Sequence, residues 1–493
     1  MNMIIFKRYF AALMIVIGVG SCQTDLLDPV PETQFSDLVV FDTPSRIEQQ
    51  VNGIYTGVKA GQFMAGRFFV YVDIRGDNFL NETTNGVTGL ETWRHSVTNT
   101  TNEVNNLWSA AYRAINRANL FLEGLDANAS KFVVPTFPAD FNTVTVPAYR
   151  AEARFLRALC YYSLVQLYCR PYADGTGARP GLPLRLTGNT SSANNDLARS
   201  TVAEVYNQIL LDLDFAEQNL PLTYSTPLLR VTRAHRNTAI ALKTRVYLAM
   251  GQYANVISEA NKIVSAVAPF SASTGVPHAL NATFNGVFAD PYTTVESIFS
   301  MPFTVNNLPG GQNGLGSYYN PGPFGIGDYS LNPNGIYGDL VNWPNTDARR
   351  SMTSLAGTPA KPYLRKFPRG PEHLDYAPVI RYSEVLLNLA EAIARTSNLD
   401  SRAIALVNAV RRRSDTSVTI SPATNGQLIA AIMTERNIEL LGEGFRSHDF
   451  MRLLQTIPGK SGAGQPGPVI PSAELYVWPI PITELNANRL MTP

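Results

Sequence analysis

Apolar residues recur along much of the chain with the spacing of one face of an α-helix. Tyr382, Leu386, Leu389 and Ile393 follow one another in steps of four, three and four residues, which places them along one side of a helix. Thr201 with a glutamate three residues later matches a capping box at a helix start. The pattern predicts helices over 102–125, 147–168, 201–219, 233–267, 377–395, 401–413 and 426–441, the fourth as two helices that meet at residues 251–252.

Two of these segments have the pattern of helical hairpins. In ALKTRVYLAMGQYANVISEANKIV, Gly251 stands at the turn and small residues continue along the second helix. LLNLAEAIARTSNLDSRAIALVNAVRRR again has small residues where two helices must approach closely. This alternation is typical of tetratricopeptide hairpins, whose period is about 34 residues. The hairpins are not contiguous, so the pattern by itself leaves a generic helical bundle open.

Two regions lack helical periodicity. Residues 268–371 are rich in Gly, Pro and Asn around their centre, and aromatic residues are threaded through them. Residues 73–97 form a second polar region that contains Trp93. Long irregular stretches inside a compact domain are uncommon and often form binding loops. We therefore expect the ligand-facing part of the protein in these two regions.

The N-terminus has the layout of an export signal. Lys7 and Arg8 precede a short apolar run over residues 10–19, which ends in Gly20, Ser21 and Cys22. Because the run is shorter than the roughly 20 residues that span a bilayer, we interpret residues 1–21 as a cleaved signal peptide. Cys22 fits the bacterial lipobox and would carry the lipid. An ordinary cleaved signal with an incidental cysteine is the alternative.

Charge and cysteine content narrow the function further. The chain has 40 Lys and Arg against 39 Asp and Glu, a net charge of +1, so it offers no basic field for nucleic acid. Cys160 and Cys169 are nine residues apart on a predicted helix. That separation is roughly 13 Å, whereas the Cα atoms of a disulfide lie within about 7 Å. We expect two buried thiols and a fold that depends on its apolar core.

Four segments in this order resemble the SusD/RagB family of outer-membrane nutrient-binding lipoproteins. They are the lipobox with its trailing Asp25 and Asp28, then FLRALCYYSLVQLYCRPY, VIRYSEVLLNLAEAIAR, and RNIELLGEGFRSHDFMRLLQ with the ending YVWPIPITELNANRLMTP. The resemblance implies a mostly α fold, in which tetratricopeptide-like hairpins form the body and long irregular loops with minor β structure form the ligand face. It implies one domain over 22–493, with the helical body mainly at 102–267 and 376–457 and the ligand-facing loops at 73–97 and 268–375.

The resemblance also implies a function. Members capture glycans, or in some branches peptides, and pass them to a SusC-like TonB-dependent transporter. They are not enzymes and need no cofactor or metal. The lipid on Cys22 would hold the protein at the cell outer membrane, facing the exterior. A peptide-binding protein, a cell-surface glycan hydrolase and a scaffold lipoprotein that binds only proteins remain the alternatives.

Glycan capture needs flat apolar surfaces for the C–H faces of sugars and polar groups for their hydroxyl rims. Two clusters in the irregular regions offer both kinds of group, and the resemblance places ligand contacts broadly there. Their members are Asp77, Asn78, Asn81, Trp93 and Arg94 in the first cluster, and Tyr318, Tyr319, Asn320 and Trp343 in the second.

A hydrolase would need two carboxyl groups roughly 5 to 10 Å apart. Glu435, Glu439 and Glu443 form the best carboxylate cluster of the chain, since Glu435 and Glu439 share a helix face. This segment is also the one most typical of SusD-like proteins, in which it serves packing and ion pairing. The sequence contains no HExxH, CxxC or GxSxG motif, and its five histidines have no metal-ligand spacing.

Overall fold

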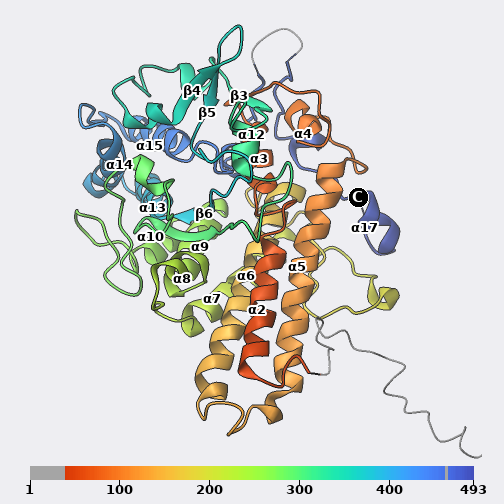
Figure 1. Cartoon of the computed structure of the whole chain (residues 1–493). Helices are drawn as coiled ribbons and strands as arrows, with labels where there is room; N and C mark the ends of the chain where they lie inside the picture. Colours follow the sequence, from red (N-terminus) through yellow and green to blue (C-terminus); the bar gives the residue numbers. More distant parts are fainter. Residues whose placement is uncertain (1–38, 461–464, 493) are drawn as a thin grey trace, which may run out of the picture.

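The computed structural model describes residues 39–460 and 465–492. Four long helices form one end of the molecule, where they pack side by side (Figure 1). They are α2 (Pro44–Val58), α5 (Asn102–Ala127), α6 (Val146–Tyr168) and α7 (Val202–Asn219). The capping box predicted for α7 is confirmed, because Thr201 Oγ1 accepts the backbone N–H of Glu204 while the Glu204 carboxylate accepts that of Thr201. Helix α2 was not predicted.

The remaining helices include both predicted hairpins. Helices α9 (Arg236–Ala249) and α10 (Tyr253–Ala260) form the first, and α13 (Tyr382–Thr396) and α14 (Ser401–Ser414) form the second. Gly251 turns the first hairpin with a φ of +70°, a conformation that glycine adopts without steric cost. Next to the second hairpin lies α15 (Asn425–Glu439). The short α16 (Arg446–Arg452) packs against α3 and is joined to α13 by the ion pair of Arg452 with Glu391.

Strands of the described chain pair only in twos. The pairs are β1 (Phe79–Asn81) with β3 (Tyr329–Leu331), β2 (Ser297–Met301) with β6 (Ala377–Arg381), and β4 (Thr353–Ala356) with β5 (Lys361–Leu364), all antiparallel. The helix predicted over 377–395 is therefore wrong at its start. Residues 377–381 are all buried and pair with β2, and the helix begins only at Tyr382.

Shorter elements occur mainly between these long ones. The short helices are α3 (Arg67–Ile74), α4 (Leu90–Arg94), α8 (Pro227–Thr232), α11 (Phe284–Val287), α12 (Leu315–Tyr319) and α17 (Ile482–Ala487). Single turns of 3₁₀-helix cover Ala129–Lys131, Ser192–Asn194, Ile336–Gly338 and Glu474–Tyr476; a longer one spans Ala348–Met352, and a π-helical turn spans Phe141–Thr145. The mostly helical fold with minor β structure is confirmed.

One large apolar core joins the helical body to the loop regions. Cys160 and Cys169 are buried within it as free thiols, as predicted. Among residues 39–460 and 465–492, no helix is both long and apolar enough to cross a bilayer. The predicted signal peptide and Cys22 lie outside the described residues.

Candidate ligand site

Both predicted loop regions meet on the surface of α15, beside the start of α16. A polar hollow of about 330 Å³ opens there. The first loop region contributes Asp77, which lies between α3 and β1. The second loop region contributes the loop after β3, and the helices form the remaining wall. The lining residues are Asp77, Asn334, Gly335, Ile336, Asp339, Met433, Thr434, Asn437 and Arg446.

A buried carboxylate fixes the start of α16. Asp73, at the end of α3, accepts hydrogen bonds from the backbone N–H groups of Gly444, Phe445 and Arg446, each at 3.0 Å. Burial raises the pKa of Asp73 to about 6, against the lowering effect of these hydrogen bonds. Gly444 has a φ of +79°, and a Cβ there would lie 2.7 Å from the Cα of Phe69. Only glycine fits this close approach.

The anchored turn directs Arg446 at Asp77. Arg446 donates from Nε and Nη2 to the two oxygens of the Asp77 carboxylate, at 2.6 and 2.8 Å. Its guanidinium carbon also lies 4.2 Å from the ring centroid of Phe450. Burial would raise the pKa of Asp77, but the hydrogen bonds and charge of Arg446 outweigh it and hold that pKa below its usual value. The Asp77 carboxylate is therefore charged at neutral pH.

Amide side chains tie the rim of the hollow together. Asn78 is buried and donates to Oδ1 of Asn437 at 2.7 Å, while its own Oδ1 accepts the backbone N–H of Ile336 at 3.3 Å. Further along the same loop, Asp339 accepts hydrogen bonds from the backbone N–H and the side-chain amide of Asn342 at 3.0 and 2.7 Å. The side-chain hydrogen bond of Asn342 lowers the pKa of Asp339, so this carboxylate also carries its charge.

A second hollow of about 370 Å³ adjoins the first and shares Met433 and Arg446 with it. Its wall is mainly apolar and includes the half-buried side chain of Phe450. We call the two hollows together the α15 groove. The second hollow is lined by Arg395, Gly426, Ile429, Ala430, Met433, Arg446, Asp449, Phe450, Leu453 and Gln455.

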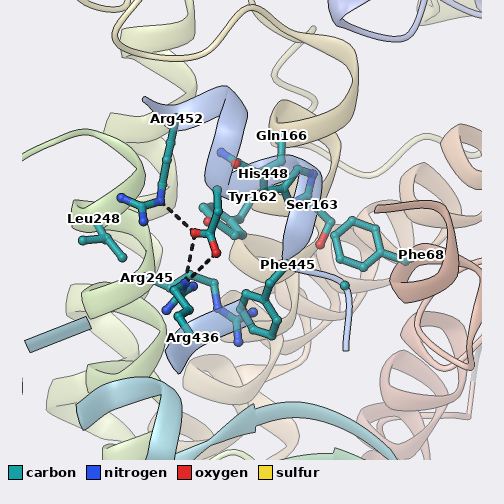
Figure 2. A pocket seen from close by; sticks show the side chains of 12 residues that line it. Phe68, Tyr162, Ser163, Gln166, Arg245, Leu248, Arg436, Phe445, His448 and Arg452 are labelled. Atoms are coloured by element: carbon teal, nitrogen blue, oxygen red, sulfur yellow. Dashed lines mark hydrogen bonds and ion pairs between the residues drawn. The ribbon is translucent and has the colours of Figure 1, made fainter. Parts of the chain in front are cut away.

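An internal ion cluster holds α16 against α15 behind the groove. The side chains of Arg436 and Arg452 converge there (Figure 2), and each donates to the buried carboxylate of Asp449 at distances from 2.8 to 3.0 Å. The pocket beside them holds about 30 Å³, which is too small for a sugar ring. This cluster is therefore a support for the groove rather than a second ligand site.

Comparisons with known proteins agree with this architecture. A family model described as "Starch-binding associating with outer membrane" matches residues 25–248, and the model of the SusD family matches residues 355–492. A crystal structure of a SusD superfamily protein from Bacteroides fragilis is 31% identical, covers 92% of this chain and 100% of its own, and has a TM-score of 0.81. The chain belongs to the SusD/RagB family.

Three further proteins resemble the chain at lower sequence identity. SusD-like protein P2 of Formosa agariphila is 26% identical, with 92% of each chain covered. A SusD superfamily structure from Bacteroides thetaiotaomicron shares the fold with a TM-score of 0.79 at 23% identity, covering 91% of this chain and 99% of its own. A structure named "Laminarin binding SusD-like protein" also shares the fold, with a TM-score of 0.69 at 21% identity. It covers 92% of this chain and 99% of its own.

The glutamate cluster typical of the SusD segment is buried in an ion-pair network. Glu435, Glu439 and Glu443 are at most 2% exposed. Their partners at 2.6 to 3.0 Å are Arg349, Arg381, Arg411, Arg413 and Lys366. The interpretation as packing and ion pairing is confirmed, since none of the three glutamates lines either hollow of the groove.

The predicted aromatic platforms are corrected by the structure. Trp93 is 5% exposed and donates from its indole nitrogen to the carbonyl of Phe79 at 3.0 Å. Trp343 is 1% exposed, with the guanidinium of Arg350 4.3 Å from its ring centroid. Such rings have no free face for a sugar, because each packs its own loop against the body. Tyr318, Tyr319 and Asn320 are likewise buried, at 1%, 0% and 0% exposure.

The other predicted contact residues differ in position. Asp77 lines the polar hollow, and Asn78 supports it through Asn437. Asn81 is half-buried in β1, and Arg94 is exposed at the end of α4; neither lines the groove. Ligand contact by Asp77, Asn81 and Arg94 stays a prediction. Sequence reasoning did not identify Asn334, Asp339, Met433, Thr434, Asn437, Arg446 or Phe450 as groove residues, although Arg446 and Phe450 lie in the most family-specific segment.

Proposed function

We propose that the protein is a surface-exposed, lipid-anchored binding protein that captures oligosaccharides or polysaccharides in the α15 groove. It would then deliver them to a partnered SusC-like TonB-dependent transporter. The observation that carries this proposal is the groove itself, in which the two irregular regions of the chain meet over one helix to form a polar hollow beside an apolar one.

The chemistry of the groove fits a carbohydrate. The polar hollow presents carboxylate, amide and hydroxyl groups from Asp339, Asn334, Asn437 and Thr434, and these can pair with the hydroxyl rim of a sugar. The apolar hollow offers the side chains of Met433 and other residues to a C–H face. Each hollow is near the lower end of the roughly 300–1,000 Å³ that small-molecule sites occupy. A chain of sugar units could extend from one hollow into the other.

The same groups favour binding over hydrolysis. A glycosidase needs one carboxyl group that still holds a proton near neutral pH. In the polar hollow, the pKa of Asp77 is held low by Arg446, and that of Asp339 by Asn342. Both carboxylates are therefore charged and hydrogen-bonded already, which supports capture without cleavage.

The outer-membrane location rests on the lipobox at Cys22 and on the family. The matching family model describes starch-binding proteins that associate with the outer membrane. Because one acyl chain gives only marginal membrane binding, stable anchoring would need the multiple chains that bacterial lipoproteins of this type carry. Delivery to the transporter is inferred from the same family membership.

The proposal is tested by titrating the soluble form, starting at Gln23, against a panel of polysaccharides and peptide mixtures, with the recovered ligand sized by mass spectrometry. Saturable binding of an unshortened glycan is expected. The double variant Met433→Ala/Asn437→Ala should weaken that binding at least tenfold. Leu211→Ala, an exposed residue on α7 outside the groove, serves as the matched control.

Three results would contradict the proposal in different ways. Shortened ligand would indicate a hydrolase. Saturable binding of peptides alone would change the ligand class. Full affinity in the double variant, with a glycan bound normally by the wild type, would place the site elsewhere on the protein.

A further inference from the structure

The charges that line the α15 groove restrict the ligand class beyond "a glycan". Two carboxylates, Asp77 and Asp339, face the polar hollow, and Arg446 is the one cation among its lining residues. The apolar hollow adds Arg395 and Asp449. What matters to a charged ligand is which of these groups already have a partner of opposite charge.

Both cations of the groove already have a carboxylate partner. Arg446 uses Nε and Nη2 on Asp77 and lays its guanidinium against Phe450. Arg395 donates to the carboxylate of Glu391 at 2.7 Å. In the polar hollow, a sulfate or uronate would have to displace Asp77 in order to form a side-on pair with Nε and Nη2 of Arg446.

Asp339, in contrast, forms no salt bridge in the part of the chain that the structure describes. Its oxygens accept hydrogen bonds from Asn342 and from the backbone N–H of Val341. The charge of Arg350, in the same loop, also helps to lower the pKa of Asp339. Its guanidinium, however, donates to the carbonyls of Trp343 and Tyr337 and stacks on the Trp343 ring. The side chains that line the polar hollow, two carboxylates and one arginine, therefore have a net charge of −1.

We propose that the α15 groove selects uncharged glycans and rejects those that bear uronate or sulfate groups, with Asp339 as the specificity-determining residue. This inference rests on the proposed function. A negatively charged group of a ligand bound in the polar hollow would be repelled by Asp339. Salt would screen this repulsion little, because the two charges would be closer than the Debye length of about 8 Å at physiological salt. Neutral hydroxyl groups, in contrast, can donate to the same carboxylate.

The test uses pairs of probes that differ only in charge: laminarin, dextran and xylan, each with its chemically sulfated form. Binding of the soluble form is measured by calorimetry at low and high salt. For any polysaccharide that binds, the affinity for the neutral form should be at least tenfold higher than the affinity for the sulfated form. High salt should reduce this affinity ratio. The variant Asp339→Asn should bind the sulfated form more tightly and so reduce the affinity ratio at least threefold.

The control variant Asp126→Asn also removes one negative charge, but at an exposed position near the end of α5. It should leave the ratio of the affinities for the neutral and sulfated forms unchanged. Equal or tighter binding of a sulfated form by the wild type would overturn this inference while the proposed function stands. If Asp339→Asn leaves both this affinity ratio and the melting temperature unchanged, the role of Asp339 is overturned. Failure of the neutral and sulfated forms alike, in this test and in the wider panel, would overturn the proposed function and this inference with it.

Discussion

Mild acid should destabilise the protein through a pair of buried histidines. His235 and His278 are both 0% exposed, and their rings stack with centroids 5.2 Å apart. Burial lowers the pKa of His235 to about 3 and that of His278 to about 4. The folded protein therefore keeps both rings neutral at any pH above these values.

The sign and size of the effect follow from the difference between the folded and unfolded states. In the unfolded chain each ring has its ordinary pKa of about 6.5 and takes up a proton as the pH falls below that value. The unfolded state then binds more protons than the folded one, so the free energy of unfolding decreases. The stability that depends on the neutral histidines is therefore fully present above pH 6.5 and is lost progressively as the pH falls towards 4. Between pH 7 and pH 5 the loss is about 2 kcal/mol for each histidine.

The variant His278→Gln isolates this contribution. Glutamine cannot take up a proton in this range, but its amide can still donate to the carbonyl of Val295, which His278 Nδ1 contacts at 3.1 Å. Urea unfolding at pH 7 and pH 5 gives the pH-dependent loss for each protein. The wild type should lose about 2 kcal/mol more than the variant, because the variant lacks the titration of His278 while the buried His235 titrates in both. Equal losses in the two proteins would refute the reasoning.

Four further outcomes test the fold and the anchor. Glu439→Gln should cost about 3 kcal/mol or more in urea unfolding, because it leaves buried arginines short of a counter-charge; a change below 1 kcal/mol would contradict the network. Gly444→Ala should lower the melting temperature and weaken ligand binding together, since the added Cβ meets backbone at α3. Thr201→Ala should cost about 1 kcal/mol in thermal unfolding through the lost cap of α7. Cys22→Ala should move the protein from the membrane to the soluble fraction, and retention would indicate another anchor.

The helices could be predicted because local periodicity dominates them. The hairpins at 236–260 and 382–414, the capping box and the two buried thiols all match the structure. Helix α2 was missed although it buries Ile47, Val51, Ile54 and Val58 along one face. Residues 377–381 were assigned to a helix because their apolar character continues into α13, and only pairing with the distant β2 makes them a strand.

The binding groove was less predictable because tertiary contacts create it. Asp77 could be identified from its polar surroundings, but the significance of Arg446 depends on Asp73, some 370 residues earlier in the chain. The aromatic residues of the loops were expected on the surface. Loops rich in Gly and Pro have few other large side chains to bury, so residues such as Trp343 and Tyr319 form the core of the loops themselves.

The pairing of β1 with β3 has a consequence for engineering the ligand face. Phe79 lies opposite Leu331, and Asn81 lies opposite Tyr329, so two loops separated by about 250 residues share one ladder and one hollow. A graft that transplants only the long loop from a relative would keep half of that ladder and half of the polar wall. The unit of exchange for new specificity is therefore the two loops together, moved onto an unchanged helical frame.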